Sequence, residues 1–431
     1  MVSILLLLPA LAAAIGPVVV EDKLPNGAAL LVSEQRNLPM VLVRVVLDAG
    51  ARRDPQAKAG LANLTADLLT EGTSTRSAQQ IKDAIDFIGG SLQTSADTDY
   101  AVASLQVLRK DLDTGLALLA DVLVHPAFKA DELARRREAV LASIRAQQDD
   151  PTTVAQKAFQ QALYGDTPYG HPDEGTEASL PRITRAEVQA FFARHYGPSS
   201  AGVVVVGDIS PVEARDRLSK ALGAWRGEPL APFVYPPVPD PPARQIRIDR
   251  PVTQAAIVMG NLGIARANPD YEAVSVMNYV LGSGGFSSRL TDNIRTQAGL
   301  AYSVGSFFAA MKAPGPFEIV MQTKNASLAD AIARAREQVE KIRNEPVSDD
   351  ELQEAKRYLT GSFPLRLDSN NKIADFIAQA WFYELGMNYA DTYIERVNAV
   401  TLADVQRVAQ AYLHPERFIE VVVTNPKGAA E

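Results

Sequence analysis

The sequence predicts an α+β fold made of two similar domains, each a mostly antiparallel sheet covered by helices. Three observations support this prediction. Strand pairs alternate with amphipathic helices along the chain, a proline-rich segment interrupts it near the middle, and the same order of elements returns beyond that segment. With 431 residues, the chain is long enough for two substantial cores. We therefore expect two halves that face each other across a hinge and form a clam-like chamber.

The first half is predicted to mix strand pairs and helices. Pro25-Asn26-Gly27 is typical of a hairpin turn inside an apolar, strand-like run. Further strands are predicted by β-branched or alternating apolar runs, and helices by apolar residues at three- and four-residue spacing. The predicted strands cover 18–31, 41–47, 91–108 (a pair) and 202–206, and the predicted helices cover 60–69, 78–88, 111–123, 130–148 and 185–195.

The middle of the chain is predicted to be an interdomain linker. Seven of the fourteen residues in 229–242 are proline, a composition that stiffens a chain and cannot form the interior of a helix or sheet. This places a linker at 229–243, between an N-terminal domain at 17–228 and a C-terminal domain at 244–431.

Two segments of the first half recur in the second at nearly the same separation. ITRAEVQAFF at 183–192 is echoed by VTLADVQRVA at 400–409, and HPAFKADELARRREAVL at 125–141 by EPVSDDELQEAKRYL at 345–359. Two matches at one separation predict a structural duplication.

Composition excludes several classes of protein. The absence of cysteine excludes disulfides, cysteine-zinc sites and thiol nucleophiles. A net charge of −8 argues against a nucleic-acid-binding protein. The basic run Arg135–Arg137 lies in a helical pattern, so we interpret it as a solvated helix face.

The N-terminus predicts export, with the periplasm as the expected compartment. Residues 1–16 form an apolar leader that ends in small residues, as secretory signals do, although no Lys or Arg precedes the apolar run. A trimmed or misplaced start is the alternative. No other segment approaches the ~20 apolar residues of a membrane span.

The stretch LGSGGFSSRLTDNIRTQAGLAYSV at 281–304 contains the main candidate site. Glycines at 282–285 precede about a dozen helix-compatible residues, and Gly299 ends them before a strand. Arg295 near the helix end and Tyr302 at the strand start can direct a guanidinium and a phenol into one space. Both groups donate hydrogen bonds and neither is a nucleophile. A helix-dipole role for the arginine and a core position for the tyrosine remain open.

No motif supplies catalytic machinery. The four histidines are too far apart for H-E-x-x-H or H-x-x-E-H, and no G-x-S-x-G elbow is present. No Gly-Lys-Ser/Thr follows the glycines, which disfavours a phosphate-binding loop.

Together, several segments resemble the pitrilysin/insulinase-type, inverted-zincin metallopeptidases, especially the short bacterial members whose two subunits form one peptidase. The segments are LPNGAALLVSEQ, GLANLTADLLTEGT, GGSLQTSADTDY, the DDP after the long helix, YGHPDEGT and SSRLTDNIRTQAGLAYSV. The last is the most specific, because the order of Arg289-Leu290, Arg295 and Gly299–Tyr302 agrees.

The departures from this family concern the metal site. Catalytic members carry H-x-x-E-H on the helix that contains Asn63, Ala66 and Asp67 here. Asn63 and Asp67 stand at the two histidine positions, and Ala66 at that of the general-base glutamate. A distal glutamate ligand is expected where Ala142 and Ser143 stand. One amide and one carboxylate cannot hold a catalytic zinc, so the resemblance implies no metal or other cofactor in this chain and zinc in a partner subunit.

The resemblance implies a function for the other half. Arg295 and Tyr302 match an arginine and a tyrosine that reach the substrate carbonyl across the cavity from the zinc. The expected function is therefore a non-catalytic, activity-completing subunit of a heterodimeric zinc peptidase, inactive alone, whose partner is a homologous H-x-x-E-H subunit and whose substrates are peptides or unfolded segments.

The resemblance also suggests a substrate-binding strand. Ser91, Leu92, Gln93 and Thr94 match a strand whose edge pairs with substrates, although Gln93 stands where catalytic members commonly have Asn. The main alternative function is a structural or peptide-binding scaffold of the same fold without a role in catalysis. A self-sufficient enzyme with an unrecognised site is a third possibility.

Overall fold

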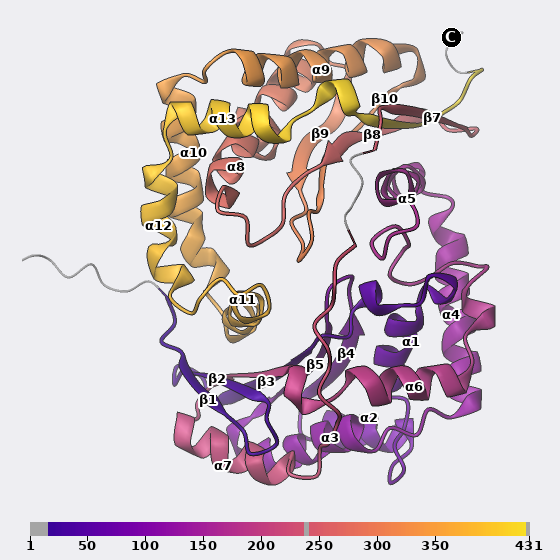
Figure 1. Cartoon of the computed structure of the whole chain (residues 1–431), viewed down its shortest axis with the longest axis vertical. Coiled ribbons are helices and arrows are strands. Elements are labelled where there is room, and N and C mark those ends of the chain that lie inside the picture. The colour runs from indigo at the N-terminus through magenta and orange to yellow at the C-terminus, as the bar shows by residue number, and fades with distance from the viewer. Residues whose placement is uncertain (1–15, 237–240, 428–431) are drawn as a thin grey trace, which may run out of the picture.

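The computed structural model describes residues 16–236 and 241–427, arranged as two halves that each contain one sheet with helices (Figure 1). All but the last residue of the predicted leader lies outside the described residues. The same holds for 237–240 of the predicted linker.

The first half contains a six-stranded sheet in the order β1-β2-β6-β3-β5-β4. Only β2 and β6 run parallel among the neighbouring strands of this sheet. The strands are β1 (Val20–Lys23), β2 (Ala29–Glu34), β3 (Met40–Leu47), β4 (Ser91–Ala96), β5 (Ala101–Leu108) and β6 (Ala201–Gly207). The helices are α1 (Leu61–Leu68), α2 (Ala78–Phe87), α3 (Leu112–Val124), α4 (Ala130–Gln147), α5 (Pro151–Tyr164), α6 (Arg185–His195) and α7 (Pro211–Ala221).

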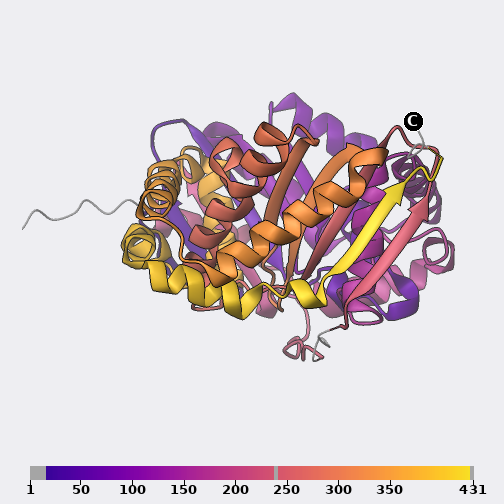
Figure 2. The ribbon, with the colours of Figure 1, turned by 90° about the horizontal axis from the view of Figure 1, so that it is seen from above.

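The second half contains a five-stranded sheet in the order β7-β11-β8-β10-β9. Its strands are β7 (Arg244–Asp249), β8 (Gln254–Leu262), β9 (Ala301–Phe308), β10 (Pro316–Lys324) and β11 (Ile419–Thr424). Its helices are α8 (Tyr271–Asn278), α9 (Leu328–Asn344), α10 (Asp349–Ser362), α11 (Asn370–Phe382), α12 (Tyr389–Ala399) and α13 (Leu402–Tyr412). Figure 2 shows the yellow strand β11 beside β7, with helices over the outer face of the sheet.

The two halves repeat one topology, which confirms the predicted duplication. In each sheet a parallel pair (β2 and β6, β7 and β11) leads into three antiparallel strands in corresponding chain order. The helices before β6 and β11 also begin alike, because Thr184 and Thr401 each form a capping box with the residue three positions on. The strand β9, which begins beside Tyr302, is therefore the counterpart of β4.

One helix of each half packs on the sheet of the other half. Helix α5 of the first half packs on β8 and β11, where Phe159 is fully buried against Val258 and Val421. Helix α11 of the second half packs on β3 and β6, where Ile377 joins an apolar cluster with Leu42. Both helices lie between the two sheets in Figure 1. Two apolar clusters therefore join the halves, in addition to the chain itself.

A buried carboxylate also joins the halves. Asp99, in the loop between β4 and β5, is 2% exposed. It accepts hydrogen bonds from the hydroxyls of Tyr169 (2.8 Å) and Tyr383 (3.1 Å) and from the backbone N–H of Lys312 (2.8 Å). Because Tyr383 and Lys312 belong to the second half, one side chain connects the β4–β5 loop to two segments of the other half.

The segment between α7 and β7 forms no helix or strand in its described part, 222–236 and 241–243. It is nevertheless anchored. The guanidinium carbon of Arg52 lies 4.6 Å from the ring centre of Phe233 and 5.3 Å from that of Tyr235, contacts that are favourable for a cation on an aromatic face.

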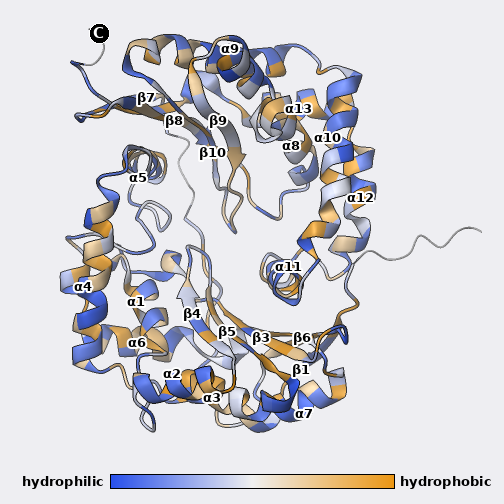
Figure 3. Cartoon of the chain, turned by 180° about the vertical axis from the view of Figure 1, so that it is seen from behind, coloured by the Kyte–Doolittle hydropathy of each residue, from blue (hydrophilic) through white to orange (hydrophobic). Residues whose placement is uncertain are grey.

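Apolar residues gather on inner strands such as β3 and β5, whereas outer helices such as α4 and α7 carry both apolar and polar residues (Figure 3). Within the described ranges, no helix combines the length and the apolar character needed to cross a membrane.

Candidate functional site

Within 281–304, the sequence predicts a helix of about a dozen residues between the glycines and Gly299, and the structure has a shorter helix there, at 289–297. Tyr279–Ser283 is a π-helical turn, Gly285–Ser287 a 3₁₀ turn and Thr291–Gln297 a π-helix. Gly285 has a φ of +60°, so the chain bends at the glycine cluster before the helix begins. Gly299, with a φ of +63°, ends the last helical turn where the sequence predicts.

Arg295 and Tyr302 come together, as the sequence predicts. The guanidinium carbon of Arg295 lies 4.9 Å from the ring centre of Tyr302 and 4.7 Å from that of Phe286. Tyr302 is 80% exposed and Phe286 71% exposed, so neither ring is a core residue. In the described part of the chain, no carboxylate pairs with Arg295 and no hydrogen bond occupies its side chain. Its N–H groups are therefore available to a ligand.

The helix α1 does not present a metal site. Asp67 accepts a hydrogen bond from Nε of Arg136 on α4 at 2.7 Å and is 10% exposed. Burial raises the pKa of Asp67, and the Arg136 guanidinium partly opposes this rise. A guanidinium at the one available carboxylate repels a divalent cation.

The other positions of the expected zinc set offer no further anionic ligand. Ala66 is buried, and Ala142 and Ser143 on α4 are exposed. Among the described residues, no group of three His, Cys, Asp or Glu side chains lies close enough together to hold a metal ion. The residues of this chain thus do not fit the zinc site of catalytic relatives.

The basic run on α4 is not simply a solvated face, which corrects the interpretation from the sequence. Arg135 pairs with Glu71 and Glu132. Arg136 holds Asp67, and Arg137 donates to a backbone carbonyl oxygen at 2.6 Å. The pairing with Asp67 has no local sequence signal, because the two residues are 69 positions apart and meet only when α1 packs on α4.

The predicted substrate strand is an edge strand. Strand β4 pairs with β5 on one side only, within the part of the chain that the structure describes. Ser91 and Gln93 are exposed, whereas Leu92 and Thr94 are half-buried. An edge of this kind leaves backbone N–H and C=O groups open to an added strand.

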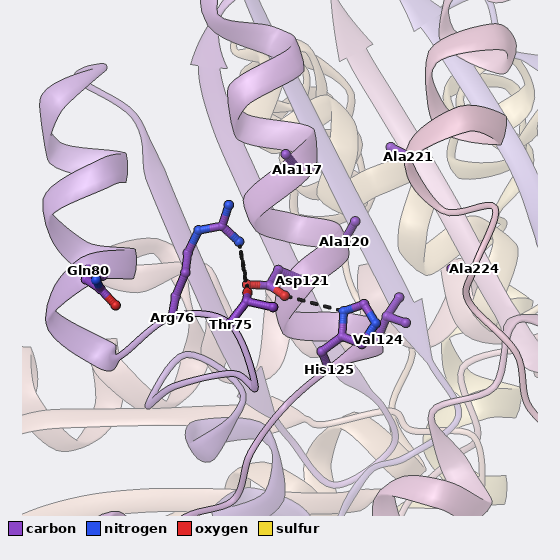
Figure 4. Close-up of a pocket in the computed structure, with 10 residues that line it drawn as sticks. All are labelled: Thr75, Arg76, Gln80, Ala117, Ala120, Asp121, Val124, His125, Ala221 and Ala224. Carbon is purple, nitrogen blue, oxygen red and sulfur yellow. Dashed lines mark hydrogen bonds and ion pairs between the residues drawn. The ribbon is translucent and has the colours of Figure 1, made fainter.

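A hollow of about 570 Å³ lies among α2, α3 and α7, on the side of the first half away from the second (Figure 4). Its carboxylate, Asp121, accepts hydrogen bonds from Thr73, Thr75 and Arg76 at 2.6–2.8 Å. It also lies 3.4 Å from His125. These bonds lower the pKa of Asp121 against the effect of its burial. Because these neighbours already occupy the carboxylate of Asp121, we interpret the cluster as one that stabilises the fold.

Three acids lie around the start of α1 and the β4–β5 loop. Asp54 is buried and Asp173 is half-buried, whereas Asp97 is exposed as a residue although its carboxyl group is largely shielded from water. Asp54 accepts from the backbone N–H groups of Gly60 and Ala62, both at 2.8 Å, and caps that helix. Burial raises the pKa of Asp97 to about 6 and that of Asp173 to about 7. Their partners are backbone and hydroxyl groups of the β4–β5 loop, so these acids stabilise the loop.

Two family models match the chain. Residues 30–177 match "Insulinase (Peptidase family M16)" and residues 182–359 match "Peptidase M16 inactive domain". A zinc protease of Streptomyces coelicolor is 27% identical over 408 residues, which cover 93% of this chain and 88% of the relative. A zinc protease of Bacillus subtilis is 25% identical over 403 residues, which cover 94% and 97%.

Solved structures agree with these relatives. A peptidase M16 inactive domain from Pseudomonas fluorescens superposes with a TM-score of 0.90 and 31% identity, covering 94% of this chain and 98% of the other. A protease from Helicobacter pylori, 20% identical, shares the fold with a TM-score of 0.86 over 95% of this chain and 100% of the other. The chain therefore belongs to the insulinase family of M16 peptidases.

Proposed function

We propose that this chain is the non-catalytic subunit that completes the active site of a heterodimeric zinc metallopeptidase. The partner is a homologous subunit with an intact H-x-x-E-H helix, which holds the zinc, and this chain binds none. The substrates are peptides or unfolded segments.

The observation that carries the proposal is a contrast between the two halves of one chain. In the second half, Arg295 lies over Tyr302 without an acidic partner. In the first half, Arg136 occupies the only carboxylate at the family's metal positions, Asp67. A donor pair that has no acidic partner and no metal site in its own chain suits a subunit that acts at the active site of another subunit.

The donor pair suits the chemistry of peptide hydrolysis. When water adds to a peptide carbonyl, negative charge develops on the carbonyl oxygen. The guanidinium N–H groups of Arg295 and the hydroxyl of Tyr302 can donate to that oxygen, and donors fixed before the reaction stabilise it most. Neither group takes a proton from water or forms a covalent intermediate.

The edge strand β4 supports a lesser role in substrate binding. Its backbone at Ser91–Thr94 can pair with an extended peptide, which then adds a strand to the sheet. Because Gln93 departs from the family pattern, we place the main substrate strand on the partner.

Co-purification tests the proposal. The chain is expressed together with a homologue from the same organism that carries H-x-x-E-H. The complex is purified, its zinc is counted per subunit, and hydrolysis of an unstructured peptide is measured. We expect zinc in the homologue alone, hydrolysis by the complex, loss of hydrolysis after chelation, and none by this chain alone.

Other results lead to different functions. A stable complex whose peptidase rate is unaffected by Arg295→Ala and Tyr302→Phe would indicate a scaffold or peptide-binding protein. Hydrolysis by this chain alone that survives chelation would indicate a self-sufficient enzyme.

We further propose export to the periplasm, on the basis of the apolar leader at 1–16. Fractionation of cells that express the full chain with a C-terminal tag tests this. Recovery of the tag in the cytoplasmic fraction, with the leader intact, would contradict it.

A further inference from the structure

The glycine cluster at 282–285, to which the proposed function gives no role, determines where Phe286 lies. A Cβ on Gly282 would lie 2.4 Å from Oγ of Ser306, and one on Gly284 would lie 2.6 Å from the backbone oxygen of Tyr279. Gly285 has a left-handed φ of +60°. The turn therefore passes too close to its neighbours, and bends too sharply, for residues with side chains.

The turn ends with a phenylalanine that is not buried. Phe286 is 71% exposed, whereas large apolar side chains usually contribute to a core. Its ring lies 4.7 Å from the guanidinium carbon of Arg295. The glycines thus direct an aromatic ring onto an arginine rather than into the core.

Arg295 lies against a second ring as well. The ring centre of Tyr302 lies 4.9 Å from the same guanidinium carbon. Among the described residues, no carboxylate pairs with Arg295. Guanidinium groups stack favourably on aromatic faces, and such contacts leave the N–H groups at the rim of the plane free to donate.

We propose that Phe286 is a positioning residue that holds the Arg295 guanidinium over Tyr302. With the ring in place, the donors of Arg295 point to one location before a substrate binds. The oxygen to which they donate is the carbonyl oxygen of a bound peptide, so the positioning role of Phe286 rests on the proposed function. The Gly282–Gly285 turn is then part of the site, because only that turn brings Phe286 to Arg295.

The first test needs no partner subunit. In the isolated chain, ¹⁵N relaxation of the Arg295 Nε–H group reports how rigid the side chain is, and Arg295→Lys identifies its signal. We expect Phe286→Leu to lower the order parameter, because an alkyl chain offers no aromatic face, and Phe286→Tyr to preserve it. Phe87→Leu, at a phenylalanine that is 91% exposed on α2, is the matched control. An Arg295 that is equally rigid in Phe286→Leu and in the unmodified chain overturns the proposal.

The second test uses the two-subunit complex. We expect Phe286→Leu to lower kcat by about two- to fivefold, on the scale of a lost cation–π contact at an exposed site, with a smaller change in KM. Phe286→Tyr restores kcat, and Phe286→Leu has no further effect when Arg295 is already alanine. An equal loss in the Arg295→Ala background contradicts the proposal. A complex that is indifferent to Arg295 itself refutes the proposed function and the substrate role of Phe286 with it, while the relaxation test still shows whether Phe286 orders Arg295.

Discussion

The guanidinium carbon of Arg295 lies 4.9 Å from the ring centre of Tyr302, although the two residues belong to different elements. Arg295 belongs to the last helical turn before Gly299, and Tyr302 to the start of β9. Gly299, with a φ of +63°, lies between the two elements, and the half-buried Arg295 meets an exposed Tyr302. This arrangement places two hydrogen-bond donors side by side without a neighbouring acid.

Removing either donor tests this arrangement. In the complex with a zinc-binding partner, we expect Arg295→Ala and Tyr302→Phe to lower kcat by roughly 10²-fold or more, as for a lost oxyanion donor. The midpoint of thermal unfolding should hardly change, since neither side chain supports a core. Peptidase kinetics and calorimetry on both variants measure this, with Tyr358→Phe as the control at another exposed tyrosine. A fall in kcat that tracks lost stability would contradict the prediction.

The part of the fold that the sequence predicts well has strong local signals. The helix Arg185–His195 agrees at both ends with its predicted range, because Thr184 and Glu187 form a capping box that fixes its start. The duplicated order of strands follows from two sequence echoes, one of which carries the same cap at Thr401. Periodicity and caps are local, so a single sequence contains them.

The features that the sequence does not predict depend on packing between segments that are distant in the chain. A helix-compatible composition does not distinguish the π-helix Thr291–Gln297 from an α-helix. The contact of Arg136 with Asp67 requires that α1 pack on α4. For Phe286 there was a partial signal, a large apolar residue directly after two glycines, but its contact with Arg295 is visible only in three dimensions.

The pair of Asp67 and Arg136 predicts a pH-dependent cost when the cation is removed. Arg136→Met leaves the largely buried carboxylate of Asp67 without its partner, which should cost about 1–2 kcal/mol at pH 8; the value is modest because Arg136 is itself partly exposed. Burial already raises the pKa of Asp67, and loss of the cation raises it further. At pH 5 a larger fraction of this carboxyl is protonated than at pH 8, and a protonated carboxyl needs no cation, so the cost should be smaller there.

Urea denaturation at the two pH values measures this difference. The matched control is Arg145→Met, at an arginine of the same helix that is 59% exposed and pairs with the exposed Glu177. Equal losses of unfolding free energy at pH 5 and pH 8 would show that Arg136 acts through packing of its alkyl chain rather than through Asp67.

The half-buried acid Asp173 predicts that the protein loses stability as pH rises. Its pKa is raised by burial to about 7 in the folded chain, whereas that of an unfolded aspartate is about 3.9. The folded state therefore binds more protons between these values, and its stability falls as pH rises through the folded pKa. Asp97, with a pKa of about 6, contributes in the same direction.

Asp173→Asn isolates this effect. Asparagine keeps an acceptor for the hydroxyl of Thr98, which donates to Asp173 at 2.9 and 3.0 Å, and it never ionises. We expect the variant to lose less unfolding free energy than the unmodified chain between pH 5 and pH 8, by on the order of 1–3 kcal/mol. Chemical denaturation across this pH range measures it, and parallel stability curves for the two proteins would exclude ionisation of Asp173 as the cause.

The junction at Asp99 predicts how firmly the halves are held together. Tyr383→Phe removes the hydroxyl that donates to Asp99 from the second half at 3.1 Å, and keeps the ring that packs on Tyr100 and Phe382. Asp99 retains its bonds from the hydroxyl of Tyr169 and from the backbone N–H of Lys312. The loss should therefore be about 1.5–3 kcal/mol, on the scale of one hydrogen bond to a charged group. The apolar clusters around α5 and α11 remain intact, and we therefore expect local loosening rather than separation of the halves.

Hydrogen exchange measures this loosening. It should become faster in the β4–β5 and β9–β10 loops and remain unchanged in β3 and β8. Uniformly faster exchange would show instead that the hydroxyl supports the global fold. Unchanged exchange would show that this hydroxyl is not needed to hold the two halves together.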